Sequence, residues 1–148
     1  MKSVFGKTIK VSGNNFPVQN LDVVNNIKGK IVTVRGTVVK DKPALVVEIE
    51  SPEKSGRFID WIYYSAEKAE NSVGYAVSKA NSLIAAVGEQ PNQEEERDMD
   101  WVQQVFEDAR DQGLEFNFSQ RLRNYEGTDR PVITYTTSPM IEEARVLG

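Results

Sequence analysis

The segment 57–65, RFIDWIYYS, places four aromatic residues beside one arginine and one aspartate. If the segment is a β-strand, alternate side chains point to opposite faces, so Arg57, Trp61 and Tyr63 share one face and Asp60 lies on the other. Aromatic faces stack the bases of single-stranded nucleic acids, and cations hold the phosphates. We expect Trp61 and Tyr63 to point outward beside Arg57 as a stacking surface. The alternative is that both rings fill the core, because large aromatic side chains are mostly buried.

A second group of cations lies nearer the other end of the chain. In the segment 114–125, LEFNFSQRLRNY, apolar and polar residues alternate, which places Arg121, Arg123 and Tyr125 together on the polar face. Further cations that could contact phosphates follow the first predicted strand, its turn and the start of the last strand: Arg35, Lys40, Lys42 and Arg130. Each of these four, taken alone, is better explained as a surface cation. Together with the rings, the cations predict a site for single-stranded nucleic acid.

Charge is unevenly distributed along the chain. The net charge is -4, yet residues 1–47 carry eight basic and two acidic residues, whereas residues 48–110 carry six basic and fourteen acidic ones. A polyanion responds to the local surface rather than to the mean charge, so the basic first third is compatible with nucleic acid. The alternative is that these lysines only keep edge strands soluble.

The absence of cysteine and histidine removes several kinds of chemistry. Without cysteine there is no disulfide framework and no thiolate nucleophile, and without histidine the commonest base at neutral pH is missing. The acidic run 94–100 offers carboxylates that Mg²⁺ prefers, but consecutive helical residues point in several directions, and an acidic helix start explains them. We therefore expect no catalysis, no metal and no cofactor. The chain shows neither a membrane-length apolar run nor a signal-peptide core, which predicts a cytoplasmic protein.

Strand and helix signals surround these residues in a definite order. Alternating runs rich in β-branched residues predict five strands, at residues 29–40, 44–50, 57–65, 114–125 and 130–137. Gly36, in the middle of the first run, predicts a bulge or a sharp bend. Between the third and fourth strands, apolar residues at helical spacing predict a helix over 73–87, and Asn92 with Glu95 fits the capping box of a second helix.

Three strands, a helical insertion and two further strands form the layout of an OB-fold. We predict a single, mainly β, α+β domain over residues 1–148, built as a five-stranded OB-like Greek-key barrel with helices between strands three and four. Residues 1–27 are assigned to an N-terminal extension, 66–112 to the helical insertion and 138–148 to a tail. A generic α+β sheet with helices on one side would show the same order of elements.

The run from residue 29 to 137 resembles phage-encoded single-stranded-DNA-binding proteins of the OB-fold type. The similar features are the strand pair GKIVTVRGTVVK and ALVVEIE, the strand GRFIDWIYYS, the helix ending in SLIAAVG and the late element GLEFNFSQRLRNYEGTDRPVITY. The resemblance implies sequence-nonspecific binding of single-stranded DNA in phage-type replication or recombination. It also implies replication or recombination proteins as partners, a homo-oligomer and a location in the host cytoplasm.

A function of a different class stays open. The chain would then be a non-enzymatic viral structural module or host-protein-interaction module, in which the acidic helical insertion docks a basic partner protein. A barrel with a helical insertion serves many functions, so the fold alone does not decide between the two hypotheses.

Overall fold

The structure is a computed structural model that describes residues 19–39, 41–65, 68–89 and 97–136. Within these residues the chain forms, in order, β1 (Val24–Val39), β2 (Lys42–Glu50), β3 (Arg57–Tyr63), α1 (Ala69–Ala86), α2 (Met99–Asp111), β4 (Glu115–Tyr125) and β5 (Thr128–Thr136). Alternation of β-branched residues accounts for the strands, and apolar residues at helical spacing account for the helices. The predicted α+β class, with both helices between the third and fourth strands, is confirmed.

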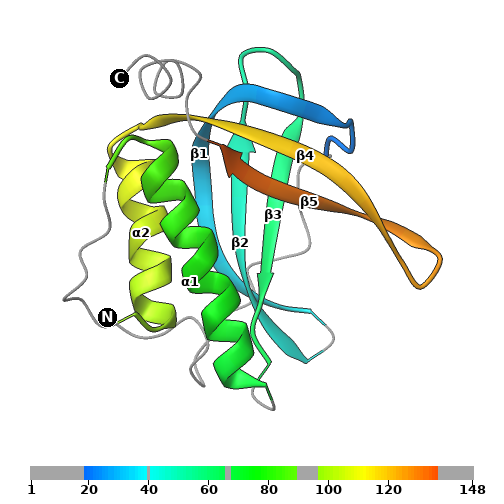
Figure 1. Cartoon of the computed structure of the whole chain (residues 1–148), viewed down its shortest axis with the longest axis vertical. Helices are drawn as coiled ribbons and strands as arrows, with labels where there is room; N and C mark the ends of the chain where they lie inside the picture. Colours follow the sequence, from blue (N-terminus) through cyan, green and yellow to red (C-terminus); the bar gives the residue numbers. More distant parts are fainter. Residues whose placement is uncertain (1–18, 40, 66–67, 90–96, 137–148) are drawn as a thin grey trace, which may run out of the picture.

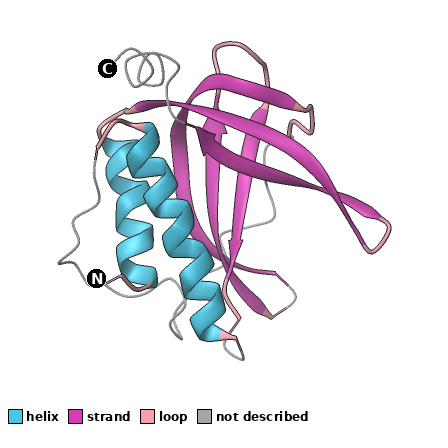
Figure 2. Ribbon diagram, in the orientation of Figure 1, coloured by secondary structure: helices cyan, strands magenta, loops and turns pink. Residues whose placement is uncertain are grey.

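The strands form one antiparallel sheet in the order β3-β2-β1-β4-β5. β1 lies at its centre, because the first part of β1 pairs with β4 and the second part with β2. Lys30 belongs to both pairings and lies opposite Glu50 on one side and Glu115 on the other. Figure 1 shows both helices on one side of the molecule, while the β4–β5 hairpin extends away from them. The same division between a pair of helices and a curved sheet is visible in Figure 2.

β1 begins earlier than predicted. It starts at Val24 rather than at Gly29, so residues 24–27, assigned above to an N-terminal extension, belong to the sheet. The pairing with β4 shifts register just before Ile27, where Asn26 adopts a φ of 56°. The Asn26 side-chain oxygen accepts a hydrogen bond of 2.7 Å from the Thr136 hydroxyl. Polar side chains therefore hold this part of the strand, and an apolar alternation pattern does not detect it.

The bulge predicted at Gly36 lies elsewhere. Gly36 pairs regularly with Leu45, whereas the register between β1 and β2 shifts between Ile31 and Thr33. Glycine can adopt ordinary strand geometry, so its presence in a strand marks a bulge only where the backbone requires it. The shift near Val32 adds a residue to β1, which increases the local twist and bends the long strand.

An apolar core fills the space between the helices and the inner face of the sheet. Phe58 and Ile62 of β3 are fully buried in it, together with Phe106 of α2 and, almost fully, Leu83 of α1. Burial of a side chain of this size stabilises the fold by roughly 1.5–3 kcal/mol relative to its exposure. The apolar spacing of the two helices is thus explained by the single face that each presents to the sheet.

The second helix begins at a different cap from the predicted one. The carboxylate of Asp98 accepts a hydrogen bond of 2.9 Å from the Trp101 backbone N–H, which satisfies one of the free amides of the first turn. The predicted capping box of Asn92 and Glu95 lies outside the described residues. Among the helices of the described part of the chain, none is long and apolar enough to cross a membrane.

Gly29 allows β1 to pass very close to the core. A methyl group added there would lie 2.5 Å from Phe118 Cε1 and 2.8 Å from Ile49 Cγ2, both shorter than any real contact of a Cβ atom. The position therefore requires glycine for space rather than for an unusual backbone angle. Phe118 in turn contacts the Phe58 ring edge to face, with ring centroids 5.0 Å apart.

A buried polar cluster joins the two outer strands of the sheet. Asp60, on the inner face of β3, accepts a hydrogen bond of 2.9 Å from the Tyr135 hydroxyl of β5. Lys79 of α1 lies 3.3 Å from the same carboxylate and also donates to the Ile133 carbonyl. All three side chains are buried, and each charge has its partner. These two partners explain why an aspartate occurs on the otherwise apolar inner face of β3.

The environment of Tyr135 changes the pKa of its hydroxyl. Burial holds this pKa well above its usual value of 10.0, and the negative charge of Asp60 raises it further. The folded protein therefore keeps Tyr135 neutral under conditions in which the unfolded chain begins to ionise it. This contribution to stability is present below about pH 10 and is lost as the pH rises above that value.

Replacing Tyr135 by phenylalanine tests this cluster. Tyr135→Phe removes the hydrogen bond to Asp60 and is expected to lower the free energy of unfolding by about 1–3 kcal/mol near neutral pH. The loss should shrink as the pH rises above 10.0, because only the wild type has the Tyr135 hydroxyl to ionise on unfolding. Urea denaturation near neutral pH and above pH 10.0 measures both effects. The control is Tyr75→Phe on α1, where the ring is 53% exposed and the change should be small. Equal stability of Tyr135→Phe and wild type would contradict the role assigned to the cluster.

A pair of glycine substitutions tests the close approach of β1. Gly29→Ala is expected to destabilise the protein by roughly 1–3 kcal/mol, because the added methyl group must displace Phe118 or Ile49. Gly74→Ala in α1 is the matched change, since nothing lies within 4 Å of the new methyl group. Gly74→Ala should stabilise the helix by roughly 0.5–1 kcal/mol. Thermal and chemical denaturation measure the change in stability of each variant. If Gly29→Ala leaves the stability unchanged, the core accommodates the added methyl group at this point.

Candidate functional site

The aromatic side chains of β3 are divided between the two faces of the sheet. Phe58 and Ile62 point into the core, whereas Trp61 and Tyr63 lie on the opposite, outer face. The Trp61 and Tyr63 rings are stacked, with centroids 6.4 Å apart and an interplanar angle of 14°. Tyr63 is 40% exposed and Trp61 is half-buried. The two stacked rings therefore form an aromatic surface on the face that the helices do not cover.

Small and apolar residues of β2 support these rings. Val46 is the cross-strand neighbour of Trp61, and Ala44 is the neighbour of Tyr63. Both are fully buried although they belong to the outer face. Alanine and valine side chains have little rotamer freedom to lose, so they support the rings at a small cost in conformational entropy. This arrangement favours rings that are held in place before a ligand binds.

Arg35 and Arg57 lie on the same outer face as the two rings. Arg35 is the other cross-strand neighbour of Val46, and its guanidinium lies 3.6 Å from the carboxylate of Glu48. Glu48 is buried, so Arg35 compensates a charge that would otherwise be isolated. Arg57 is half-buried at the start of β3, and its carbonyl accepts a hydrogen bond of 2.7 Å from the Asn20 backbone N–H.

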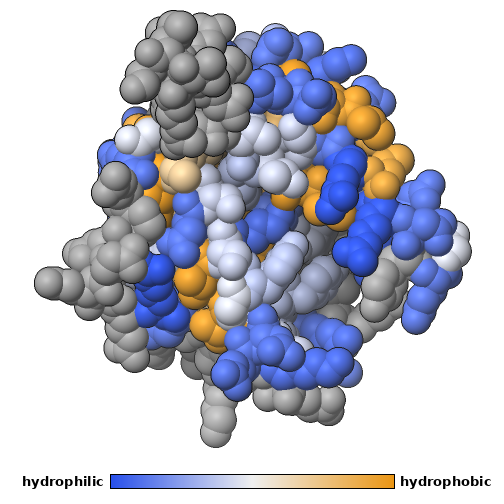
Figure 3. Space-filling view, in the orientation of Figure 1, coloured by the Kyte–Doolittle hydropathy of each residue, from blue (hydrophilic) through white to orange (hydrophobic). Residues whose placement is uncertain are grey.

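The β4–β5 hairpin carries three exposed arginines. Arg123 and Arg130 are directly opposite each other in the register, and Arg121 lies two residues before Arg123 on the same face. A two-residue turn of Glu126 and Gly127 connects the strands, with φ values of 52° and 82°. Two positive φ values are typical of the type I′ turn, whose twist matches that of the strands. Figure 3 shows hydrophilic residues covering this projecting hairpin.

Three other predicted residues are placed less fully. Tyr125 is the last residue of β4, and its side chain lies outside the described part of the structure. Lys40 also lies outside the described residues. Lys42 is exposed at the start of β2, directly after the β1–β2 turn. Figure 1 shows the β4–β5 hairpin extending away from the helices, whereas the β1–β2 hairpin points toward the bottom of the view.

The predicted residues thus fall into two groups. The outer face of β1, β2 and β3 carries Arg35, Arg57, Trp61 and Tyr63, and the β4–β5 hairpin carries Arg121, Arg123 and Arg130. Within each group the residues are neighbours in the sheet. This arrangement combines aromatic rings with positively charged side chains outside the core. No cluster of three or more potential metal ligands occurs in the part of the chain that the structure describes.

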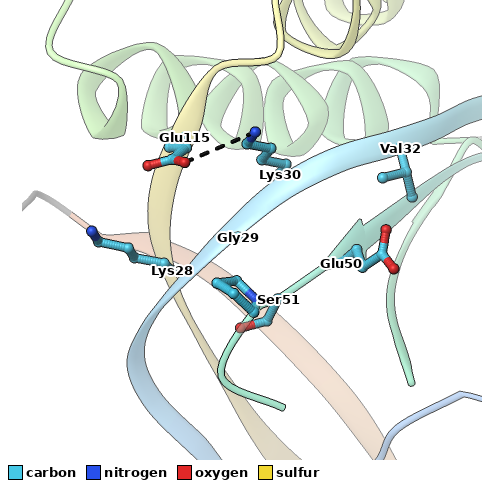
Figure 4. Close-up of a pocket in the computed structure, with 8 residues that line it drawn as sticks. Lys28, Gly29, Lys30, Val32, Glu50, Ser51 and Glu115 are labelled. Atoms are coloured by element: carbon cyan, nitrogen blue, oxygen red, sulfur yellow. Dashed lines mark ion pairs between the residues drawn. The ribbon is translucent and has the colours of Figure 1, made fainter. Parts of the chain in front are cut away.

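Two lysines of β1 were not among the residues predicted from the sequence. Lys28 and Lys30 line a hollow of about 320 Å³ together with Gly29, Val32, Glu50, Ser51, Pro52 and Glu115. Figure 4 shows these side chains arranged around the backbone of Gly29, with Lys30 and Glu115 facing each other. The lining comes from three strands and the turn after β2, so no local sequence pattern contains it. The alternation of lysine, glycine and lysine is the one signal that could have indicated it.

No family model matches the chain, and no curated protein matches it.

Proposed function

We propose that this protein binds single-stranded DNA without sequence preference along most of the strand, and that it is not an enzyme. Phosphates would contact the arginines of the β4–β5 hairpin, and bases would stack on Trp61 and Tyr63. Phosphate contacts and stacking are available in any sequence, so they support a nonspecific site. In line with the resemblance of residues 29–137, we place this activity in phage-type replication or recombination, in the host cytoplasm.

The topology supports an OB-like Greek-key barrel as the finer description of the fold. The order β3-β2-β1-β4-β5 leaves β3 and β5 as the outer strands, and the hydrogen bond between Asp60 and Tyr135 brings them together. Closing the sheet at this place would produce a small, partly open barrel. In OB-folds the face of strands two and three and the two hairpin loops bind oligonucleotides. The rings and the arginines occupy these same positions.

The arginines of the β4–β5 hairpin are the observation that carries the proposal. Arg121 and Arg123 are exposed on one face of a hairpin that projects from the body, and Arg130 lies opposite Arg123. Arginine binds phosphate with two parallel hydrogen bonds, so a phosphate backbone that follows this face would meet several such groups. A hairpin selected only for stability would not require three arginines on one face.

The stacked rings supply the second part of the proposal. Each base stacked on an aromatic side chain contributes roughly 1–3 kcal/mol to binding. The Trp61 and Tyr63 rings are nearly parallel and stacked on each other, so a base would extend an existing stack. Their buried supports on β2 keep that surface in place before the strand arrives.

The double variant Arg121→Ala/Arg123→Ala tests the hairpin. Each lost phosphate contact is expected to reduce the slope of log K against log salt by about 0.7, so the slope should fall by about 1.4. Fluorescence anisotropy of a labelled oligo-dT, titrated at several salt concentrations, measures the slope. Lys68→Ala/Arg110→Ala removes the same charge from the helical side and should leave the slope unchanged. An unaltered slope in the hairpin variant would exclude these arginines from the site.

Substitution of the two tryptophans tests the stacking surface. Trp61→Ala should weaken oligo-dT binding by roughly 1–3 kcal/mol while the melting temperature changes little, because the ring lies outside the core. In Trp101→Phe, Trp61 is the sole tryptophan, and its fluorescence should still be quenched by the oligonucleotide. In Trp61→Phe the quenching should disappear. Unchanged affinity with a sharply lower melting temperature for Trp61→Ala would instead show that the ring is structural.

A further inference from the structure

The hollow around Gly29 presents alternating charges on the outer face of the sheet. Lys30 lies between two acidic cross-strand neighbours, Glu50 on β2 and Glu115 on β4. Its ammonium group is 3.9 Å from the Glu115 carboxylate, and the two side chains are 51% and 60% exposed. Exposed ion pairs at such a distance contribute little to stability. The fold therefore does not depend on this pair, and both groups are available to a ligand.

The lining of the hollow is partly apolar. It includes Gly29, Val32 and Pro52, with Ser51 beside the charged side chains. Its volume of about 320 Å³ lies at the lower end of the range of ligand pockets, which suits one small planar molecule. A partly apolar lining with charged groups beside it is an environment that a heteroaromatic ring fits.

The rim selects among such rings by hydrogen bonding. A carboxylate only accepts hydrogen bonds and has two oxygens side by side, whereas an ammonium group only donates. The complementary ligand edge has two adjacent N–H donors beside one acceptor. Guanine has this edge, with N1–H and N2–H₂ next to O6. Thymine has one donor between two acceptors, and adenine and cytosine each have a single amino donor next to an acceptor, so none of them fits as well.

We propose that this hollow binds one unpaired guanine base of the bound strand, with O6 toward Lys30 and the two N–H donors toward Glu115 or Glu50. The proposal rests on the single-strand binding proposed above and adds a local base preference to it. Unpaired strands expose the Watson–Crick edges of their bases, so the required edge is free to enter.

The hollow lies on the same face of the sheet as the proposed stacking surface. Glu50 is the cross-strand neighbour of both Lys30 and Arg57, so these three residues form one row across the outer face. Trp61 lies four residues beyond Arg57 on the same face of β3, roughly 13 Å along the strand. One strand of DNA can therefore reach both places. Lys28 is exposed beside the hollow, with its backbone N–H held by Glu53 at 2.7 Å, and is placed to contact a flanking phosphate.

Oligonucleotides that differ in one amino group test the assignment. The probes are oligo-dT, the same strand with one central deoxyguanosine, and the same strand with deoxyinosine, which lacks only the N2 amino group. Wild-type protein should bind the guanine strand about five- to tenfold more tightly than the inosine strand, the effect of one good base contact. Glu50→Gln/Glu115→Gln should remove this difference. The control Glu70→Gln/Glu89→Gln makes the same change of charge beside α1 and should preserve it.

The possible outcomes separate this inference from the function on which it rests. If wild type binds none of the three strands, the proposed function fails and the inference fails with it. Tight binding of all three strands with equal affinity supports the function and overturns the guanine site. A guanine preference that persists in Glu50→Gln/Glu115→Gln places the preference elsewhere and also overturns the site. Free guanosine monophosphate could instead bind wild type but not Glu50→Gln/Glu115→Gln, without any guanine preference within strands. This result would assign the hollow to a free nucleotide and overturn its role in binding the strand.

Discussion

The carboxylate of Asp60 is the constraint around which the sheet is organised. It lies on the inner face of β3, among side chains that are otherwise apolar, and it receives hydrogen bonds from the Tyr135 hydroxyl and the Lys79 ammonium group. An ionised carboxylate without such partners would be very unfavourable in this position. The outer strands β3 and β5 and the helix α1 must therefore remain together for the core to stay closed.

This requirement on the inner face also determines what the outer face can present. Because alternate side chains point in opposite directions, the register that turns Asp60 toward Tyr135 turns Trp61 and Tyr63 outward. A slip of one residue would bury the rings and expose the carboxylate. The buried cluster and the aromatic surface are consequently two results of one register, although only the aromatic surface is available to a ligand.

Periodicity was sufficient to predict the elements but not the contacts between distant ones. The runs of β-branched residues indicated the strands, and alternation separated Phe58 and Ile62 from Trp61 and Tyr63. The partners of Asp60 could not be predicted, because Lys79 and Tyr135 lie 19 and 75 residues away and neither belongs to a recognisable motif. The early start of β1 was missed because asparagine side chains stabilise it. The hollow at Lys30 was missed because its walls come together only when β2 and β4 have both paired with β1.

The double pairing of β1 has a consequence for how the chain folds during synthesis. β1, β2 and β3 are joined by short turns, so this three-stranded unit can form while the rest of the chain is still being made. The first part of β1, however, pairs with β4, with Val24 opposite Gln120, and must remain without that partner until β4 has left the ribosome. The Asp60 carboxylate gains its second buried partner only when Tyr135 follows. Folding to the final state is therefore governed by the C-terminal hairpin, and the same hairpin that presents the arginines completes the fold.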